Sequence, residues 1–305
     1  MNRALLLVLA FLLGGQAATA QSDGISQPLA DDSERCAVDD KQRRVCLETP
    51  ARRIVALSPG ATELAYAAGA GKALVGVVSH SDYPPQAAEL PRVGSHSRLD
   101  LEALAALRPD LVLGWASGNP TSQMETLQAL GIPMFYLEPN DVEGIAGAIE
   151  RLGVLAATGD QAKQEAQRFR QAMAQLQQRY GEKDPITIFY QVWHSPLMTV
   201  NGEHWISDAI ERCGGINIFA GLERLAPPVD LEAVLAADPD AIVSGGRGED
   251  DTQWLQQWRV YPELTAVQRD NLFLVPPSLL QRPTPRLAEG TALLCEQLQD
   301  ARMRR

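Results

Sequence analysis

Aromatic, histidine and polar side chains gather where the expected strands of the chain end. They are His80, Tyr83, His96 and Trp115 in the first half, and Trp193, Ser278 and Arg282 in the second half. Parallel sheets bind ligands at the carboxyl ends of their strands, so this placement predicts a cleft. An aromatic lining with a few polar groups suits a bulky, partly apolar ligand. Core packing explains any one of these aromatics equally well, so the inference depends on their clustering.

Catalytic motifs are not found around these residues. The histidines at positions 80, 96, 194 and 204 lack the H-x-x-x-H and H-E-x-x-H spacings of metal sites. Two or three of them converging on a metal or on haem iron is the alternative. Ser195 and the Ser207-Asp208 pair have no nucleophile-elbow context, and the chain has no P-loop, GxGxxG or kinase signature. We therefore expect a binding protein with no catalytic residue, no cofactor and no metal site of its own.

Strands and helices alternate in the part of the chain that would position these residues. Apolar runs at 54–57, 74–78, 111–113 and 134–137 predict short strands. The first is followed by a helix for which Thr62 is the expected N-cap, ending at Gly69. Alternation of this kind is typical of a mainly parallel sheet covered on both faces.

An internal repeat at an offset of 130 residues indicates two lobes of similar construction. Asp100-Leu101-Glu102-Ala103 recurs as Asp230-Leu231-Glu232-Ala233, and seven of fifteen residues are identical between 100–114 and 230–244. Each copy predicts a short helix, a Pro-Asp turn and a buried strand. Coincidence between Ala- and Leu-rich helices is the alternative, and the shared Pro-Asp and Glu positions argue against it.

A long amphipathic helix separates the two copies. One apolar stripe, spaced by threes and fours, consists of Ala162, Ala166, Phe169, Met173, Leu176 and Tyr180. Thr158 or Asp160 is the expected N-cap, with Gln161 as the capping-box partner of Thr158, and Gly181 ends the helix. We expect an α/β protein with a lobe at 51–157, a linking helix at 158–181 and a second lobe at 182–305. The alternative is that this helix belongs to one lobe.

The start of the chain has the features of an export signal. Arg3 precedes an apolar run from Ala4 to Leu13, and Ala18-Thr19-Ala20 fits a cleavage site. The run is shorter than the roughly 20 residues of a membrane-spanning helix. A buried N-terminal helix is the alternative. We expect residues 1–20 to be a signal peptide and the mature protein to be soluble and exported to the periplasm.

Four cysteines in an exported chain predict disulfides. Cys36 and Cys46 flank a stretch that fits a turn between two strands, which leaves Cys213 and Cys295 as the second pair. Four cysteines allow three connectivities; we favour this one, with free buried thiols as the alternative. We expect residues 21–50 to form an extension with a small hairpin.

The overall charge limits the class of partner. The chain has 305 residues and a formal net charge of −11. Nucleic acid and anionic membrane surfaces both reward clustered Lys and Arg, so neither is the expected main partner. Glu102 and Glu232 hold equivalent places in the repeat, each near a helix start. They either solvate those helices or form a matched pair that docks onto a symmetric basic partner.

Several short segments of the chain are similar to those of a known protein family. Residues 53–59 (Arg-Ile-Val-Ala-Leu-Ser-Pro), 81–85 (Ser-Asp-Tyr-Pro-Pro), Gly114-Trp115, residues 213–219 and Pro285-Arg286 are similar to the cobalamin, haem and siderophore class of binding proteins of ABC importers. Within that class the residues lean toward the cobalamin binders. The resemblance covers about residues 50 to 300 and implies two Rossmann-like lobes with a ligand cleft between them.

The resemblance carries further expectations about partners. It implies that Glu102 and Glu232 form salt bridges to arginines of a permease dimer in the inner membrane, and that Cys213 pairs with Cys295. It places Trp115 and Arg282 at cleft positions of the family. Family aromatics are replaced by His80, His96, Met198 and Ala226, and a pocket acid by Ser278. We therefore expect a monomer that binds a corrinoid, either vitamin B12 or cobinamide, with His80 or His96 as a possible axial ligand to cobalt. Haem or a ferric siderophore is the alternative ligand.

Overall fold

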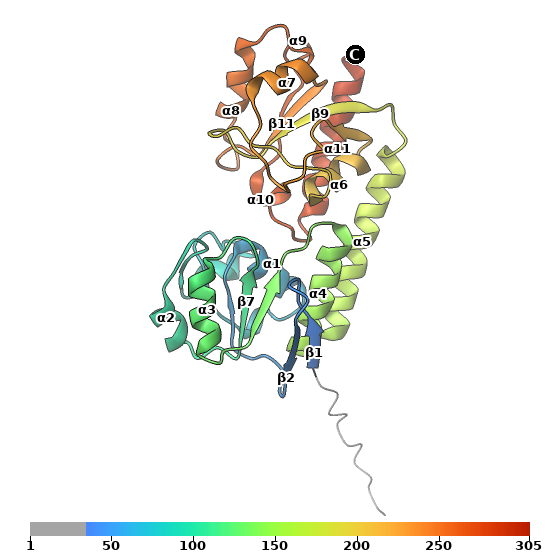
Figure 1. Cartoon of the computed structure of the whole chain (residues 1–305). Coiled ribbons are helices and arrows are strands. Elements are labelled where there is room, and N and C mark those ends of the chain that lie inside the picture. The colour runs from blue at the N-terminus through green and yellow to red at the C-terminus, as the bar shows by residue number, and fades with distance from the viewer. Residues whose placement is uncertain (1–34) are drawn as a thin grey trace, which may run out of the picture. The chain divides into compact units, whose positions relative to one another are not determined.

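The computed structural model describes residues 35–305 (Figure 1). The expected signal peptide, residues 1–20, and the first part of the expected extension, up to residue 34, lie outside the described residues. No helix within residues 35–305 is both long enough and apolar enough to cross a membrane.

Two four-stranded parallel sheets organise the chain. The first has the order β4-β3-β7-β8, formed by Leu74–Val77, Ile54–Ala56, Leu111–Trp115 and Met134–Leu137. The second has the order β10-β9-β11-β12, formed by Gly215–Asn217, Ile186–Gln191, Ala241–Ser244 and Leu272–Leu274. In each sheet the first strand along the chain lies inside, paired with the second and third. The predicted α/β fold with two similar lobes is confirmed.

Helices surround both sheets. In the first lobe they are α1 (Pro59–Ala67), α2 (Leu101–Ala106), α3 (Thr121–Ala129) and α4 (Val142–Ala156), with 3-10 turns at Gly71–Ala73 and Pro85–Glu89. The long helix α5 spans Gly159–Tyr180. In the second lobe they are α6 (Trp205–Arg212), α7 (Leu231–Ala237), α8 (Gln253–Gln256), α9 (Thr265–Gln268), α10 (Pro277–Leu280) and α11 (Leu287–Met303), with a 3-10 turn at Gln257–Val260. Two small antiparallel pairs complete the list: β1 (Arg35–Val38) with β2 (Arg44–Leu47), and β5 (Gly94–Ser95) with β6 (Arg98–Leu99).

Alternation along the strands explains why helices cover both faces of the first sheet. Ile54 and Ala56 of β3 pack in a core with residues of α1 and α4, whereas Val55 packs in a second core with residues of α2 and α3. Successive side chains of a strand point to opposite faces, so a strand that is apolar throughout is buried on both. All three residues of β3 are buried.

The repeated Pro-Asp turn has a structural role in both lobes. The Asp110 carboxylate accepts hydrogen bonds from the backbone N–H groups of Arg52 and Arg53, at 2.8 and 3.0 Å, just before β3 begins. The Asp240 carboxylate accepts from the backbone N–H and the hydroxyl of Thr187 in β9, at 3.0 and 2.9 Å. Each aspartate thus ties the start of β7 or β11 to the start of the neighbouring strand. This equivalence explains the aspartates that the two sequence copies share.

Helix α5 packs against α4 of the first lobe and against α6 and α11 of the second (Figure 1). Its predicted capping box is wrong, because the Thr158 hydroxyl donates to the carbonyl of Ala68 at 2.6 Å and caps no N–H of its own helix. The predicted cap of α1 is also wrong. Ser58 is the N-cap, its hydroxyl accepting from the N–H of Ala61 at 3.0 Å, and Thr62 lies within the helix.

Two disulfides link the predicted cysteine pairs. Cys36 and Cys46 stand opposite each other in the β1–β2 hairpin, and Cys213 after α6 is joined to Cys295 of α11. The hairpin lies against the edge of the first sheet, where the N–H of Asp40 donates to the carbonyl of Tyr136 at 3.0 Å. Strand β8 is the last strand on that side, so the hairpin covers an edge with unpaired backbone groups.

Candidate functional site

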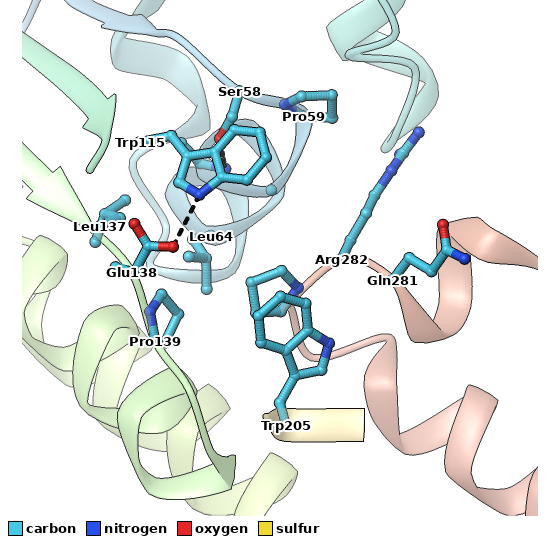
Figure 2. Close-up of a pocket in the computed structure, with 13 residues that line it drawn as sticks. Ser58, Pro59, Leu64, Trp115, Leu137, Glu138, Pro139, Trp205, Gln281 and Arg282 are labelled. Atoms are coloured by element: carbon cyan, nitrogen blue, oxygen red, sulfur yellow. Dashed lines mark hydrogen bonds between the residues drawn. The ribbon is translucent and has the colours of Figure 1, made fainter. Parts of the chain in front are cut away.

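A cavity of about 110 Å³ lies between the two lobes (Figure 2). Its lining is mostly apolar and comes from strand ends and helix starts: residues 58–61, Leu64, Trp115 and residues 137–139 of the first lobe, and Trp205 with residues 281–283 of the second. Of the predicted ligand residues, the structure places Trp115 and Arg282 in this lining. The position fits the rule that ligands bind at the carboxyl ends of parallel strands.

Trp115 is held from two sides. It is the last residue of β7, and its backbone N–H donates to the Asn119 side chain at 2.7 Å. Its indole N–H donates to Glu138 Oε1 at 3.1 Å, shown as a dashed line in Figure 2. The His96 ring lies with its centroid 5.7 Å from that of Trp115, at a 50° angle. The structure thus brings two predicted residues, Trp115 and His96, side by side.

Glu138 and Asn119 were missed as site residues. The buried Asn119 amide donates to the carbonyls of Leu57 and His96, at 2.9 and 3.0 Å, and so joins two strand-end loops. Glu138 directly follows β8, so applying the strand-end rule to residues 134–137 would have found it. Asn119 has no comparable signal, because its role depends on tertiary contacts.

Arg282 bridges the two lobes. Its Nη1 lies 2.8 Å from Glu63 Oε1 and 2.9 Å from Asp82 Oδ1, and its Nη2 donates to the carbonyl of His80 at 3.3 Å. Thr284 also donates to Glu63, at 2.9 Å. Through this bridge the His80 loop and helix α1 of the first lobe contact the segment before α11 of the second lobe.

The two carboxylates of this bridge respond differently to it. Burial raises the pKa of Glu63 despite the opposing hydrogen bonds and charge of Arg282, because only 4% of the residue is exposed. For Asp82, partial burial alone would raise the pKa, but the hydrogen bond and charge of Arg282 outweigh it, and the net pKa is lowered. The predicted ligand residue Arg282 is therefore already engaged with protein acids.

Arg286 connects two further predicted residues. Its guanidinium lies 4.1 Å from the ring centroid of Tyr83, in a cation–π arrangement. Its Nη2 also donates to the Ser278 hydroxyl at 3.3 Å. Ser278 in turn donates to Glu249 at 2.7 Å. Ser278 is buried, whereas Tyr83 is exposed.

Trp193 and Met198 lie at the carboxyl end of β9 and are not in the lining of the 110 Å³ cavity. The N–H of Met198 donates to the carbonyl of Trp193 at 3.1 Å, which closes a tight loop. Trp193 is 49% exposed, and its ring lies edge-on to Trp254 with the centroids 5.4 Å apart. A second, wider hollow of about 460 Å³ adjoins this loop, lined by His194, Leu197, Leu231, Trp254, Gln257, Trp258, Val260 and Tyr261.

The histidines take different roles. His80 and His96 lie on exposed loops of the first lobe, and His194 stacks on Trp254. His204 is buried and is the N-cap of α6, with Nδ1 accepting from the N–H of Ile206 at 3.1 Å. Burial lowers the pKa of His204 to about 3, so its ring is neutral at pH 7. In the described part of the chain, no group of three His, Cys, Asp or Glu side chains is placed to hold a metal ion.

The two repeated glutamates occupy matching positions. Glu102 lies in the first turn of α2 and Glu232 in the first turn of α7, and both are exposed. A carboxylate in this position is favoured by the helix dipole.

The structure has two α/β lobes with parallel sheets. Both lobes pack on one long helix, and a cavity lies between them at the ends of their strands. This arrangement is typical of a class of proteins that bind a small ligand between two lobes. The periplasmic binding protein family model matches residues 54–279. The chain therefore belongs to the periplasmic binding protein family.

Relatives with named ligands are found within this family. The chain is 38% identical over 252 residues to the Vitamin B12-binding protein of Vibrio cholerae serotype O1, covering 83% of this chain and 91% of the relative. It is also 38% identical over 248 residues to the Vitamin B12-binding protein of Photorhabdus laumondii, covering 81% and 88%. The predicted family resemblance is confirmed.

Solved structures agree with this assignment. The crystal structure of the periplasmic vitamin B12 binding protein BtuF of Vibrio cholerae matches with a TM-score of 0.75 at 37% identity, covering 83% of this chain and 98% of that one. The periplasmic haem-binding protein RhuT from Roseiflexus matches with a TM-score of 0.72 at 22% identity, covering 82% and 99%. The second likeness concerns the fold alone.

Proposed function

We propose that this protein captures a corrinoid, either vitamin B12 or cobinamide, in the periplasm and delivers it to an ABC import permease. The observation that carries the proposal is the 38% identity to vitamin B12-binding proteins, which extends over 83% of the chain. It therefore includes both lobes and the cavity between them.

The chemistry of the cleft supports this ligand class. A corrin ring has broad apolar faces and a rim of amide side chains. An indole such as Trp115 offers a flat surface to the ring, and Ser58, Gln281 and Arg282 offer hydrogen bonds to the rim. We propose Tyr83, His96, Trp193 and Met198 as further contacts from the two sides of the cleft, with Ser278 acting through Arg286.

To bind a corrinoid in this cavity, the lobes or the loops around the cavity must move. A volume of about 110 Å³ is smaller than the 300–1,000 Å³ typical of ligand pockets. Arg282 lines the cavity and also forms ion pairs with Glu63 and Asp82. We propose that it exchanges part of that bridge for the corrinoid rim when the ligand enters.

The remaining assignments belong to the same proposal. Residues 51–157 and 182–305 act as two lobes on the linking helix 158–181, and the protein works as a monomer without catalytic turnover. Glu102 and Glu232, one on each lobe, dock onto basic residues of the permease dimer. His80 or His96 ligates cobalt only if it displaces an axial ligand of the corrinoid.

Calorimetric titration of the purified protein tests the ligand. Cyanocobalamin, dicyanocobinamide, haemin and a ferric siderophore are each added to separate samples. Saturable one-to-one binding of a corrinoid alone supports the proposal. Binding of haemin or the siderophore alone overturns the ligand and leaves the fold intact.

Visible spectra test the histidines. His80→Ala and His96→Ala are compared with the wild-type protein, each saturated with aquocobalamin. A shift of the bound corrinoid spectrum in one variant identifies the axial ligand. Unchanged spectra in both variants refute histidine coordination.

A further inference from the structure

One carboxylate controls the direction of the Trp115 ring. Glu138 Oε1 accepts from the indole N–H at 3.1 Å and from the Ser117 hydroxyl at 2.8 Å. Its Oε2 accepts from the Ser117 backbone N–H at 2.7 Å. The indole has a single N–H donor, so this acceptor selects one orientation of the ring. Figure 2 shows the Trp115 ring at the cleft, with its N–H directed at the Glu138 carboxylate.

Glu138 is itself held by the β1–β2 hairpin. Its backbone N–H donates to Asp40 Oδ2 at 2.6 Å. The other carboxylate oxygen of Asp40 lies 2.7 Å from Nη1 of Arg151 in α4, and the N–H of Asp40 donates to Tyr136 in β8. Asp40 thus connects the hairpin, the edge strand and the helix at the point where Glu138 leaves β8.

The hairpin is well placed to keep this contact. The Cys36–Cys46 disulfide closes it, and the Asp39 carboxylate accepts from the backbone N–H groups of Lys41 and Arg43, at 3.0 and 2.9 Å. Asp39 also accepts from the N–H of Tyr136 at 3.2 Å. The turn is therefore held both by its own disulfide and hydrogen bonds and by a contact with β8. It lies outside residues 54–279, to which the family model extends.

We propose that Glu138 is a positioning residue for Trp115, and that the N-terminal hairpin sets its place through Asp40. The hairpin thereby contributes to ligand binding without touching the ligand. This inference rests on the proposed function in one respect: Trp115 is taken to contact the corrinoid. The orientation of the indole itself is independent of any ligand.

Nuclear magnetic resonance of protein labelled with ¹⁵N at tryptophan tests the orientation directly. The indole resonance of Trp115 is assigned as the one missing in Trp115→Phe. Glu138→Gln keeps the size of the side chain but replaces one acceptor oxygen with a donor, which opposes the Ser117 N–H. We expect the Trp115 indole signal to shift and its hydrogen exchange to quicken, with the other four indole signals in place. Asp40→Ala gives the same change, and Asp40→Asn, which retains an acceptor, restores most of the wild-type signal.

Cyanocobalamin titration measures the consequence for binding. We expect about tenfold weaker binding in Glu138→Gln and Asp40→Ala, the size of one lost hydrogen bond to a charged group. Glu48→Ala, at an exposed acid just after the hairpin, is the matched control and leaves both readouts unchanged. If Glu138→Gln fails to fold, Asp40→Ala and Asp40→Asn carry the test, because Asp40 contacts Glu138 at its backbone N–H and both variants leave the Glu138 carboxylate in place; Asp40→Ala also removes the ion pair with Arg151.

The two readouts separate two kinds of failure. An unchanged Trp115 indole signal in Glu138→Gln and Asp40→Ala overturns the positioning role. A changed signal with wild-type affinity shows that Trp115 orientation does not matter for this ligand, which overturns the contribution of the hairpin to binding. No binding of cyanocobalamin to the wild-type protein refutes the proposed function, while the indole signals still decide whether Glu138 orients the ring.

Discussion

Arg282 of the second lobe and Glu63 of the first form an ion pair across the cleft, with 2.8 Å between Nη1 and Oε1. Glu63 is almost fully buried, and its charge is offset mainly by this partner, with Nη1 of Arg286 farther away at 3.8 Å. Removing one member of a buried pair leaves an uncompensated charge, which is more costly than the pair is worth.

Arg282→Ala is therefore expected to lower the free energy of unfolding by about 3–5 kcal/mol. Adding Glu63→Gln to this variant removes the stranded carboxylate, so we expect the double variant to be more stable than the sum of the single changes predicts. Urea denaturation at pH 7 measures all three. Arg98→Ala, at an exposed arginine, is the control and should stay within about 0.5 kcal/mol of wild type. Additive losses in the double variant would contradict a direct coupling.

The lowered pKa of His204 predicts that the folded protein loses stability in acid. Its folded pKa of about 3 lies below the ordinary 6.5, so between these values the unfolded chain binds a proton that the folded protein does not. The full stability is present above about pH 6.5 and is lost as the pH falls toward 3. Between pH 6.5 and 5 the loss is about 2 kcal/mol.

His204→Asn isolates this effect, because Asn retains an N-cap acceptor but does not titrate. We expect the difference in unfolding free energy between wild type and variant to shrink by that amount as the pH falls to 5. Urea denaturation at several pH values measures it. A constant difference over the whole range would show that His204 takes up its proton as readily in the folded protein as in the unfolded chain, which contradicts the lowered pKa.

Gly118 packs directly against the Trp115 ring, so a substitution at Gly118 tests how tightly the ring is confined. A Cβ atom at this position would lie 2.1 Å from Cε3 of Trp115, and the ring cannot turn away without leaving Glu138. Gly118→Ala should therefore lower the unfolding free energy by about 1–3 kcal/mol through overpacking. It should also weaken corrinoid binding.

Gly147→Ala is the matched control. A Cβ at Gly147 meets no atom within 4 Å, and the residue lies inside α4, so alanine is expected to stabilise by about 0.5–1 kcal/mol. Thermal unfolding and cyanocobalamin titration are measured on both variants. Equal binding by Gly118→Ala and wild type would mean that the ring position is not used by the ligand.

Most of the architecture could be predicted from local pattern. The strand at 134–137 is found with its predicted bounds, and the apolar stripe of α5 is buried except for the half-buried Leu176. The spacing of apolar residues indicates which face of a helix or strand is buried. It therefore predicts correctly those elements whose structure depends on burying one face. The repeat predicted two lobes of similar construction, and the two sheets have equivalent strand orders.

The site was harder to predict from the sequence than the fold, because its contacts join residues far apart in the chain. Arg282 meets Glu63 across 219 positions, and Asp40 meets Glu138 across 98. No short pattern encodes such pairs. The capping interactions also depend on tertiary structure: Ser58 and not Thr62 caps α1, and Thr158 holds the predicted N-cap position of α5 but its hydroxyl donates to the Ala68 carbonyl of another helix.

The repeated glutamates predict a two-point contact with the permease. Glu102 and Glu232 are exposed in the first turns of α2 and α7, so charge reversal there should leave the fold and the cleft intact. We expect Glu102→Lys combined with Glu232→Lys to weaken binding to the permease by on the order of tenfold or more, because like charges would face its basic sites. Each single variant should show a part of this loss.

Uptake of radiolabelled cyanocobalamin into vesicles containing the matching permease measures the effect, and calorimetry confirms that ligand affinity is unchanged. Glu125→Lys combined with Glu223→Lys is the control, since it makes the same change of net charge at exposed acids outside the repeat. Equal loss of uptake in both double variants would assign the effect to net charge. Loss confined to the Glu102 and Glu232 variant would show that matched positions on two lobes, and not acidity in general, hold the protein on its partner.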